Sequence, residues 1–271
     1  MDFKPLPPTA LPDLDMVFVK GGTFAMGDDR GDLHGSCRPI HQVQLDSFYM
    51  SKYPVTRDLW QAVMNADSSD AKGKTSWWKR TRSAISAYFD TSNKGIPPIA
   101  IKGDKRPMRS VSWEDTQQFI KKLNGISEVT FRLPTDAEWE YAARGGVLSD
   151  GYLYAGSDKL RQVGWYEGNN NEETRAVGQL RPNELGLHDM SGNVWEWCED
   201  WWSTEYYAQC HQQGLVENPC NLTTGTDRVV RGGSCFDEAA DCRCSLRIGH
   251  RPGDRLDGIG FRLVGVLQSV G

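Results

Sequence analysis

The chain has 271 residues and a formal net charge of −5, with acidic and basic residues interspersed. This charge pattern argues against a nucleic-acid-binding protein, because phosphate binding needs a concentrated basic face. No stretch approaches the ~20 consecutive apolar residues that span a bilayer. With 38% hydrophobic residues, 28 Gly and 13 Pro, the composition indicates one domain with a packed core and many turns.

The N-terminal region predicts an extended strap followed by strands. Residues 1–13 contain four prolines and lack the apolar core of a signal peptide, so either the protein is cytosolic or its targeting segment is absent from this sequence. Apolar runs at 16–19 and 24–27 flank glycines and predict a β-hairpin. Residues 41–50 alternate between polar and apolar side chains, which predicts a third strand.

Three stretches predict helices. Residues 54–64 open with Pro54 and place apolar side chains on one face. Ser112 can cap a helix whose buried stripe contains Phe119, and Thr135 satisfies the S/T-x-x-E capping rule at the start of another.

The region between the first two helices is polar and rich in turn residues, and we interpret residues 65–106 as an insertion. It carries Trp77 and Trp78 beside a basic cluster at 79–82. Arginines stacked on these rings could bind a ligand, and the alternative is a solvated insert.

A tryptophan-rich stretch at 192–202 predicts a central strand. If it is extended, Trp195 and Trp197 point to one face and Glu196 points to the other. Two indole rings would then lie in the core.

Seven cysteines leave at least one thiol unpaired in a monomer. Cys210 and Cys220 flank a polar loop, where a disulfide remains an open alternative. The cysteine spacings match no zinc pattern, and the five histidines form no i, i+3 or i+4 pair. We therefore expect neither a metal site nor a cofactor.

The most informative stretch is 228–264, in which two predicted strands enclose a segment without regular periodicity. Residues 228–231 and 259–264 alternate like strands, and 232–234 form a small-residue bend. Residues 235–258 show neither helical spacing nor sustained alternation, although they are far longer than the usual ~4–6-residue connection. Loops of this length are usually functional, and the alternative is an ordinary irregular loop.

The composition of 235–258 is unusual. Glu, Lys, Gln, Met and Trp together supply 53 residues of the chain, yet only Glu238 falls in this segment. Substituting adenines in an Asn codon yields none of these five amino acids. The residues at 248–251 and 256–258 all belong to the set that such substitution yields, and they share no structural purpose.

Six motifs, in this order, resemble the formylglycine-generating-enzyme (sulfatase-modifying factor) domain. The resemblance runs from about Met16 to Val264 and implies an irregular variant of the C-type-lectin fold. The motifs are GGTFAMG, YPVT, RLPTDAEWEYAARGG, GLHDMSGNVWEWCEDWW, RVVRGGS and GFRLV.

The resemblance leaves several functions open, because one fold can carry many. Formylglycine-generating enzymes hold copper with two cysteines five positions apart, the first lying three residues past the GGS bend. Here those positions are Asp237 and Cys242, which argues against the oxidase activity, although a relocated thiol pair could bind Cu(I). The iron-dependent sulfoxide synthases that share the domain add metal-binding histidines in an N-terminal part, and the scattered histidines here do not match them.

A third branch of the family accounts for the unusual segment. Variable proteins of diversity-generating retroelements, the Treponema type above all, use this domain, and adenine-specific mutagenesis rewrites a stretch just before the closing GFR strand. Residues 235–258 resemble that variable region. The resemblance implies that the ligand-binding residues are Cys235, Phe236, Asp237, Glu238, Asp241, Cys244, Leu246, Ile248, Gly249, His250, Arg251, Leu256, Asp257 and Gly258.

Four other residues of the segment are expected to be scaffold. Arginine side chains in an irregular loop commonly donate to backbone carbonyls that no sheet satisfies. These residues are Arg243, Arg247, Pro252 and Arg255.

We therefore expect an α+β, C-type-lectin-like fold of the formylglycine-generating-enzyme subtype, with two helices, small twisted sheets and many loops. Residues 1–13 would form the strap, 14–265 a single domain, about 65–106 its insertion, about 235–258 its variable region, and 266–271 a tail.

The expected function is noncovalent binding of a protein ligand by a surface-displayed, retroelement-diversified protein rather than an enzyme. A copper- and thiol-dependent oxidase is the alternative. We expect a monomer at the cell surface or outside the cell, with no nucleic-acid partner and with membrane contact only through a lipid anchor absent from this sequence.

Overall fold

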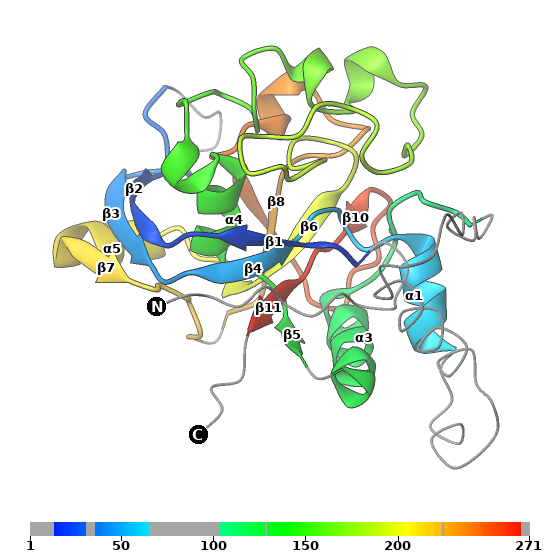
Figure 1. Ribbon diagram of the computed structural model, residues 1–271. Helices are drawn as coiled ribbons and strands as arrows, with labels where there is room; N and C mark the ends of the chain where they lie inside the picture. The colour runs from blue at the N-terminus through cyan, green and yellow to red at the C-terminus, as the bar shows by residue number, and fades with distance from the viewer. Residues whose placement is uncertain (1–13, 31–35, 66–102, 128, 224, 267–271) are drawn as a thin grey trace, which may run out of the picture.

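The computed structural model describes residues 14–30, 36–65, 103–127, 129–223 and 225–266 (Figure 1). The predicted strap and the part of the predicted insertion that carries Trp77 and Trp78 lie outside these residues. Within the described part of the chain, no helix is long and apolar enough to cross a membrane.

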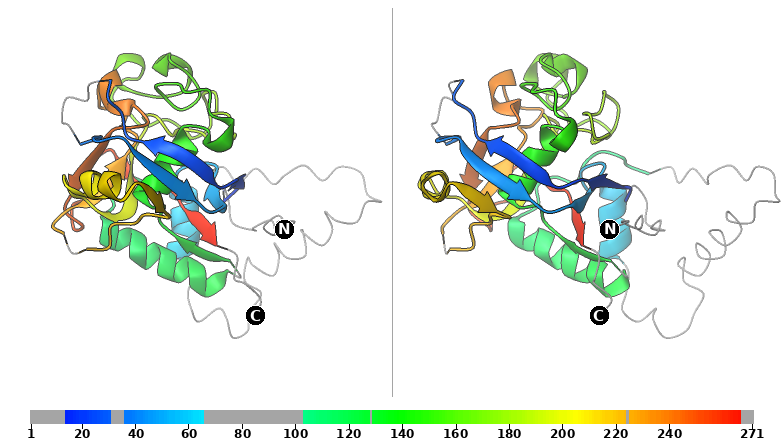
Figure 2. Two further views of the ribbon diagram at one scale, coloured as in Figure 1. Left: turned by 90° about the vertical axis from the view of Figure 1, so that its left-hand side faces the viewer. Right: turned by 60° about the vertical axis from the view of Figure 1, so that its left-hand side comes forward.

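The described residues form three small sheets. Two of these sheets are joined by a pair of antiparallel chain segments that bends and continues from one sheet into the other. One sheet has the order β1-β4-β11-β5 and the other the order β2-β3-β7. Figure 2 shows the blue β2–β3 ribbon crossing one side of the molecule. The strands are β1 (Met16–Val19), β2 (Gly22–Met26), β3 (His41–Leu45), β4 (Phe48–Ser51), β5 (Thr130–Arg132), β7 (Leu215–Glu217) and β11 (Val264–Val266).

The predicted hairpin between the first two strands is wrong, because β1 pairs with β4 and β2 pairs with β3. The chain bends at Gly21 without folding back. A Cβ atom there would lie 2.4 Å from the Leu45 carbonyl oxygen, so only glycine allows this approach. The partner ribbon breaks at the same place, where the Gly21 backbone N–H donates to Ser47 Oγ at 2.9 Å, and the single strand predicted at 41–50 becomes two.

The third sheet carries the segment of interest and has the order β10-β6-β8-β9. The closing strand predicted at 259–264 is divided: β10 runs parallel to β6, whereas β11 joins the first sheet. Arg262 lies between them and turns inward to donate to both carboxylate oxygens of Glu196, at 2.6 and 2.8 Å. The strands are β6 (Trp195–Trp201), β8 (Arg228–Arg231), β9 (Arg247–His250) and β10 (Ile259–Gly260).

Four α-helices occur in the described residues: α1 (Arg57–Met64), α3 (Trp113–Ile126), α4 (Asp136–Ala143) and α5 (Tyr206–Gln213). The N-cap predicted at Ser112 and the capping box predicted at Thr135 are confirmed, as is the helix that ends at Met64. Sequence patterns did not predict α5, whose apolar face is short. The α+β fold class is confirmed; beside the two helices that the resemblance implied, the described residues contain α1, which the sequence predicted at 54–64, and α5.

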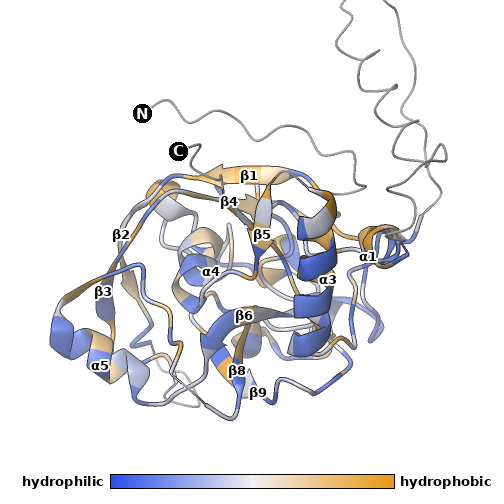
Figure 3. Cartoon of the chain, turned by 90° about the horizontal axis from the view of Figure 1, so that it is seen from below, coloured by the Kyte–Doolittle hydropathy of each residue, from blue (hydrophilic) through white to orange (hydrophobic). Residues whose placement is uncertain are grey.

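The core combines apolar clusters with buried ions. Trp197 is fully buried and Trp195 is 6% exposed, so both indole rings lie in the core as predicted. In Figure 3, α4 lies near the middle of the molecule between α5 and α3. Four side chains from α4, β8 and β9 form what we call the buried ion-pair network: Asp136, Glu140, Arg231 and Arg247.

Candidate functional site

Residues 235–258 form part of the third sheet and are not an irregular loop throughout. The segment contains a 3-10 helix, η5 (Ala239–Cys242), and then β9, which pairs antiparallel with β8. Because β9 is the outer strand of this sheet, it lies at the rim (Figure 3). The sequence did not predict β9, because a strand of four residues with one clearly apolar position is too short to show alternation.

Three predicted ligand-binding residues lie in the interior. Cys235 and Cys244 are fully buried and Leu246 is 1% exposed. Leu246 packs in the core cluster around Trp197, and Cys244 packs in the cluster around Trp139. In this structure these side chains cannot contact a protein ligand, because core packing covers them.

Two predicted variable glycines occupy restricted positions. A Cβ atom on Gly249 would lie 2.8 Å from the ring of Trp202. Gly258 has a φ of +97°, and a Cβ there would lie 3.0 Å from Phe236. Substitution at either position requires a neighbouring group or the backbone to move.

Asp237 also has an internal role. One of its carboxylate oxygens accepts hydrogen bonds from Trp195 Nε1 and from the Ser234 backbone N–H, both at 2.8 Å, and from Ser234 Oγ. The Asp237 carbonyl accepts from the Glu167 backbone N–H at 3.1 Å. The side chain therefore fastens the start of the segment to β6 instead of projecting from it.

Ten of the fourteen predicted residues remain at least partly accessible. We set aside Asp237, which bonds internally, and Gly249, whose position is restricted, and call seven of the others the exposed patch. Its clearest members are Leu256, which is 42% exposed, and Asp257, whose side chain is 60% exposed. Asp241 is partly buried in η5 and is left out. The exposed patch comprises Phe236, Glu238, Ile248, His250, Arg251, Leu256 and Asp257.

The start and the end of the segment 235–258 are neighbours in space. Phe236 adjoins the backbone of Gly258, which follows Asp257. Burial lowers the pKa of His250, and the opposing influence of Asp254, Asp227 and Asp237 is weaker. The close approach of Phe236 to Gly258 thus brings the start and the end of the segment together.

All four predicted scaffold residues bond to other parts of the chain, and the predicted bonds from buried arginines to backbone carbonyls are confirmed for Arg243 and Arg247. Arg247 lies 2.9 Å from Asp136 and donates to the Ser203 carbonyl at 3.1 Å. Arg243 donates to the Ala240 carbonyl at 2.8 Å.

The other two scaffold residues anchor the segment to the start of α3. Arg255 makes two bonds to Asp115, at 2.7 and 2.8 Å. The Pro252 carbonyl accepts from the Glu114 backbone N–H at 3.3 Å. These contacts hold the backbone next to Arg251 and Leu256 without using the side chain of either residue.

The buried ion-pair network links strands β8 and β9 of the third sheet to α4. Arg231 pairs with Asp136 at 2.5 Å and with Glu140 at 2.8 Å. Burial opposes ionisation of Asp136, but Arg231 and Arg247 outweigh it and hold the pKa of this carboxyl below its ordinary value. Nearby, burial and the Asp136 charge raise the pKa of Asp200 to about 7.

The positions that correspond to the copper-binding cysteines do not fit copper. Asp237 replaces the first thiol, and its hydrogen-bonded carboxylate is a poor partner for a soft metal. Cys242 is buried, which raises the pKa of its thiol. The disulfide considered for Cys210 and Cys220 is absent from this structure. Within the described residues, no group of three or more His, Cys, Asp or Glu side chains could hold a metal ion.

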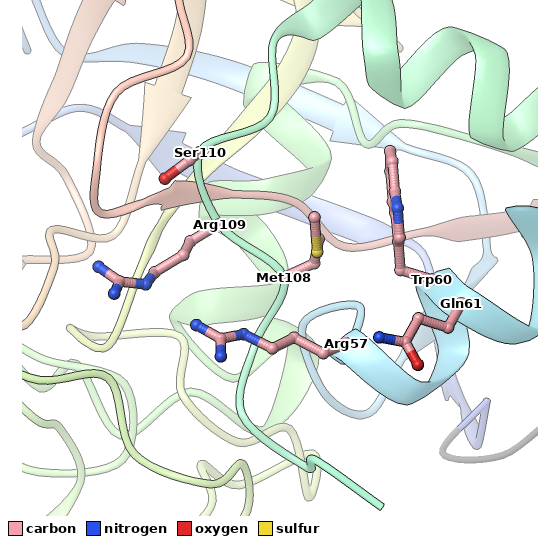
Figure 4. Close-up of a pocket in the computed structure, with 6 residues that line it drawn as sticks. All are labelled: Arg57, Trp60, Gln61, Met108, Arg109 and Ser110. Carbon is pink, nitrogen blue, oxygen red and sulfur yellow. The ribbon is translucent and has the colours of Figure 1, made fainter.

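A pocket of about 480 Å³ borders the exposed patch. Figure 4 shows the guanidinium groups of Arg57 and Arg109 extending to the same side, while Trp60 and Met108 lie on the other. Trp60 is held in place because it stacks on Phe119 with ring centroids 5.2 Å apart. Sequence reasoning missed this pocket, because its two walls, α1 and the residues before α3, are far apart in the chain. The residues that line the pocket are Arg57, Trp60, Gln61, Met108, Arg109 and Ser110.

Comparisons with solved structures agree with the predicted fold and with the resemblance to variable proteins. Treponema denticola variable protein 1 superposes with a TM-score of 0.69 at 26% sequence identity, covering 92% of this chain and 94% of that protein. PvdO from Pseudomonas aeruginosa also superposes with a TM-score of 0.69, at 24% identity and over 97% of this chain and 99% of that one. The second match bears on the fold alone.

Sequence comparisons give relatives of several kinds. Formylglycine-generating enzyme of Streptomyces coelicolor is 32% identical over 286 residues, covering 91% of this chain and 87% of that enzyme. Serine/threonine-protein kinase pkn1 of Chlamydia caviae is 32% identical over 252 residues, covering 92% of this chain but only 37% of the kinase. The model of the sulfatase-modifying factor enzyme 1-like domain matches residues 3–266, and the chain belongs to this family.

Proposed function

We propose that this chain is a ligand-binding protein whose exposed patch is diversified by a retroelement while the rest of the domain stays fixed. The observation that carries the proposal is the division within residues 235–258. Arg243 and Arg247 are buried and make internal contacts, whereas Arg251 and Leu256 are exposed. Substitutions at exposed positions usually change stability by less than ~0.5 kcal/mol.

The similarity to Treponema denticola variable protein 1 supports this proposal but does not decide it. Formylglycine-generating enzymes are equally similar in sequence. The choice rests on Asp237, which stands where the resemblance places a copper-binding cysteine and which fastens the segment internally. That arrangement suits a binding scaffold better than an oxidase.

The chemistry of the exposed patch favours a protein ligand. Phe236, Ile248 and Leu256 offer apolar contact, and charged side chains surround them. Protein interfaces combine apolar anchors with a polar rim in this way. Placement at the cell surface or outside the cell, and a monomeric state, are parts of the same proposal.

Sequencing the gene and its flanking DNA in many clones of one culture tests this function. Diversification predicts a nearby near-copy that differs from the gene almost only at adenines. It also predicts that changed codons encode mainly the exposed patch and spare Arg247 and Arg255. An invariant gene without such a copy would refute the proposal.

A second candidate, a copper- and thiol-dependent oxidase, is favoured by the family relationship and by Cys242 at one expected ligand position. It predicts Cu(I) binding and thiol-dependent oxygen consumption that disappear in Cys242→Ser. The binding proposal predicts that Cys242→Ser leaves Cu(I) uptake unchanged. Cu(I) titration against a competing chelator distinguishes the two functions.

A further inference from the structure

One member of the exposed patch also closes the edge of the neighbouring pocket. Asp257 Oδ1 accepts a hydrogen bond from Arg109 Nη1 and another from Ser110 Oγ, the latter at 3.1 Å. Both donors line the pocket. Asp257 therefore joins the segment proposed to vary to a pocket built from other parts of the chain.

The two arginines of the pocket are both paired. Arg57 lies 3.1 Å from Asp104, and Arg109 pairs with Asp257. Asp104 also pairs with Arg106 and accepts from its own loop, so it belongs to the fixed scaffold. Asp257 is the partner that can change, and its side chain is more exposed than that of Arg109, at 60% against 28%.

The backbone beside Arg109 is held in a defined shape. Ser110 has a φ of +57°, a left-handed conformation that is uncommon for a residue other than glycine. Ser112 then caps α3 through a capping box. Removal of Asp257 should therefore leave Arg109 close to its present position, with its guanidinium group unpaired.

We infer that Asp257 selects the class of ligand group that this pocket accepts. With Asp257 present, Arg109 is neutralised and carboxylates are repelled. With an uncharged residue at position 257, Arg109 binds a carboxylate, and Trp60 and Met108 contact the apolar body of the same ligand. This inference rests on the proposed function, since it assigns a specificity role to a residue of the exposed patch.

The physical basis is charge complementarity. A guanidinium group can bind a carboxylate through two parallel hydrogen bonds, which fixes both position and orientation. An aromatic acid additionally buries its ring against the indole and thioether walls. A single adenine substitution converts an Asn codon to Asp, so diversification could switch the pocket between these two states.

Titration of the full chain with sodium benzoate tests the inference. At low ionic strength, the Trp60 indole N–H signal would be followed by NMR, with Trp60→Phe used to assign it. We expect Asp257→Asn to bind benzoate about tenfold more tightly than the unmodified chain, because one charge-assisted pair becomes available. The gain should shrink as salt is added, since the site is partly exposed.

Two matched variants make the result specific. Asp257→Asn combined with Arg109→Gln should lose the gain. Glu238→Gln removes the same negative charge elsewhere on the exposed patch and should not produce it. Equal benzoate affinity in Asp257→Asn and the unmodified chain would overturn the inference, and so would a gain that survives Arg109→Gln or appears in Glu238→Gln.

The outcome is independent of the test of function. An invariant gene together with a benzoate gain would refute diversification and leave the electrostatic role of Asp257 intact. A variable gene with no gain would leave the binding function and remove the role of Asp257 in this pocket. If Asp257→Asn lowers stability, Asp257→Ser provides the same loss of charge with a smaller side chain.

Discussion

Arg247 and Arg251 lie four residues apart in the same segment but in different physical environments. Arg247 is fully buried and pairs with Asp136 beneath the third sheet, whereas Arg251 is exposed. The same contrast separates the buried ion-pair network from the exposed patch. Under the proposed function, exposure, more than position in the sequence, would decide which side chains of residues 235–258 can change.

The contrast also explains how one backbone can carry different surfaces. Contacts with other parts of the fold fix the segment at its start through Asp237, at its middle through the buried Arg247 and near its end through the exposed Arg255–Asp115 pair. Between these points the outward side chains make few contacts that the fold requires. Under the proposed function, a change at Glu238, Arg251 or Leu256 would alter the ligand surface while leaving the free energy of unfolding nearly constant.

The largest loss of stability is expected from Arg231→Met. This change leaves the Asp136 and Glu140 carboxylates buried with less compensation, and breaking such a pair typically costs about 3–5 kcal/mol. Urea denaturation of this variant beside Arg251→Met measures the difference. A loss below ~1 kcal/mol for Arg231→Met would contradict the role of the buried ion-pair network.

Trp195→Ala should destabilise the domain by about 3–4 kcal/mol, because it leaves a cavity in the core and removes the donor to Asp237. Thermal and chemical denaturation give the free energy of unfolding. Trp195→Phe keeps most of the ring and should retain more than half of that stability. A fully stable Trp195→Ala variant would show that the segment is not fastened through this residue.

Asp237 and Asp257 form a matched pair of carboxylates within one segment. Asp237→Ala should cost about 2 kcal/mol, because it removes charge-assisted hydrogen bonds from buried donors. Asp257→Ala should cost less than ~1 kcal/mol, since its ion pair is largely exposed. Equal losses of stability in denaturation experiments would contradict the internal role assigned to Asp237 and the exposed position assigned to Asp257.

The stability of the interior should depend on pH through Asp200. Because the pKa of Asp200 is raised to about 7, while an unfolded Asp ionises near ~3.9, the folded chain binds the extra proton between these values. The stabilising contribution of the protonated Asp200 carboxyl is therefore present below pH ~4 and is lost as the pH rises to about 7. Over this range the free energy of unfolding falls with a slope of up to ~1.4 kcal/mol per pH unit.

Asp200→Asn removes this dependence. The free energy of unfolding of the unmodified chain, minus that of the variant, should fall from pH 4 to pH 7 in urea denaturation. Glu238→Gln controls for the change in net charge. Parallel curves for the unmodified chain and Asp200→Asn would show that the Asp200 carboxyl ionises normally.

The smallest effect is expected from combined alanine substitution of Glu238, Arg251 and Leu256. These side chains are exposed, and each substitution should change stability by less than ~0.5 kcal/mol. Ile248 and His250 are unsuitable for this test, since Ile248 packs against the core and His250 lies edge-on to Trp197. A drop in melting temperature of more than a few degrees would place the three residues in the fold.

Local signals predicted much of the fold. The N-cap at Ser112 and the capping box at Thr135 located two helices, because side-chain caps are encoded within four residues. The pairing of β1 was not predictable in this way. It depends on the close contact of Gly21 with Leu45, which periodicity does not report.

The candidate site was predictable only in part. Codon chemistry and the missing periodicity identified the segment, and the tendency of arginine to bind carbonyls separated Arg243 from its neighbours. The burial of Cys244 and Leu246 was not predictable, since the pattern gave no sign that β9 would pair with β8. The pocket beside Asp257 was hidden because its walls meet only in the folded chain.

Saturation of codons 235–258, followed by selection for folded protein and deep sequencing, tests the central claim most directly. The account predicts broad tolerance at the seven positions of the exposed patch, with partial restriction at Ile248 and His250. It predicts strong depletion of substitutions at Asp237, Arg247 and Gly258. Uniform tolerance across the segment, or depletion centred on Arg251, Leu256 and Asp257, would contradict the division on which the proposed function rests.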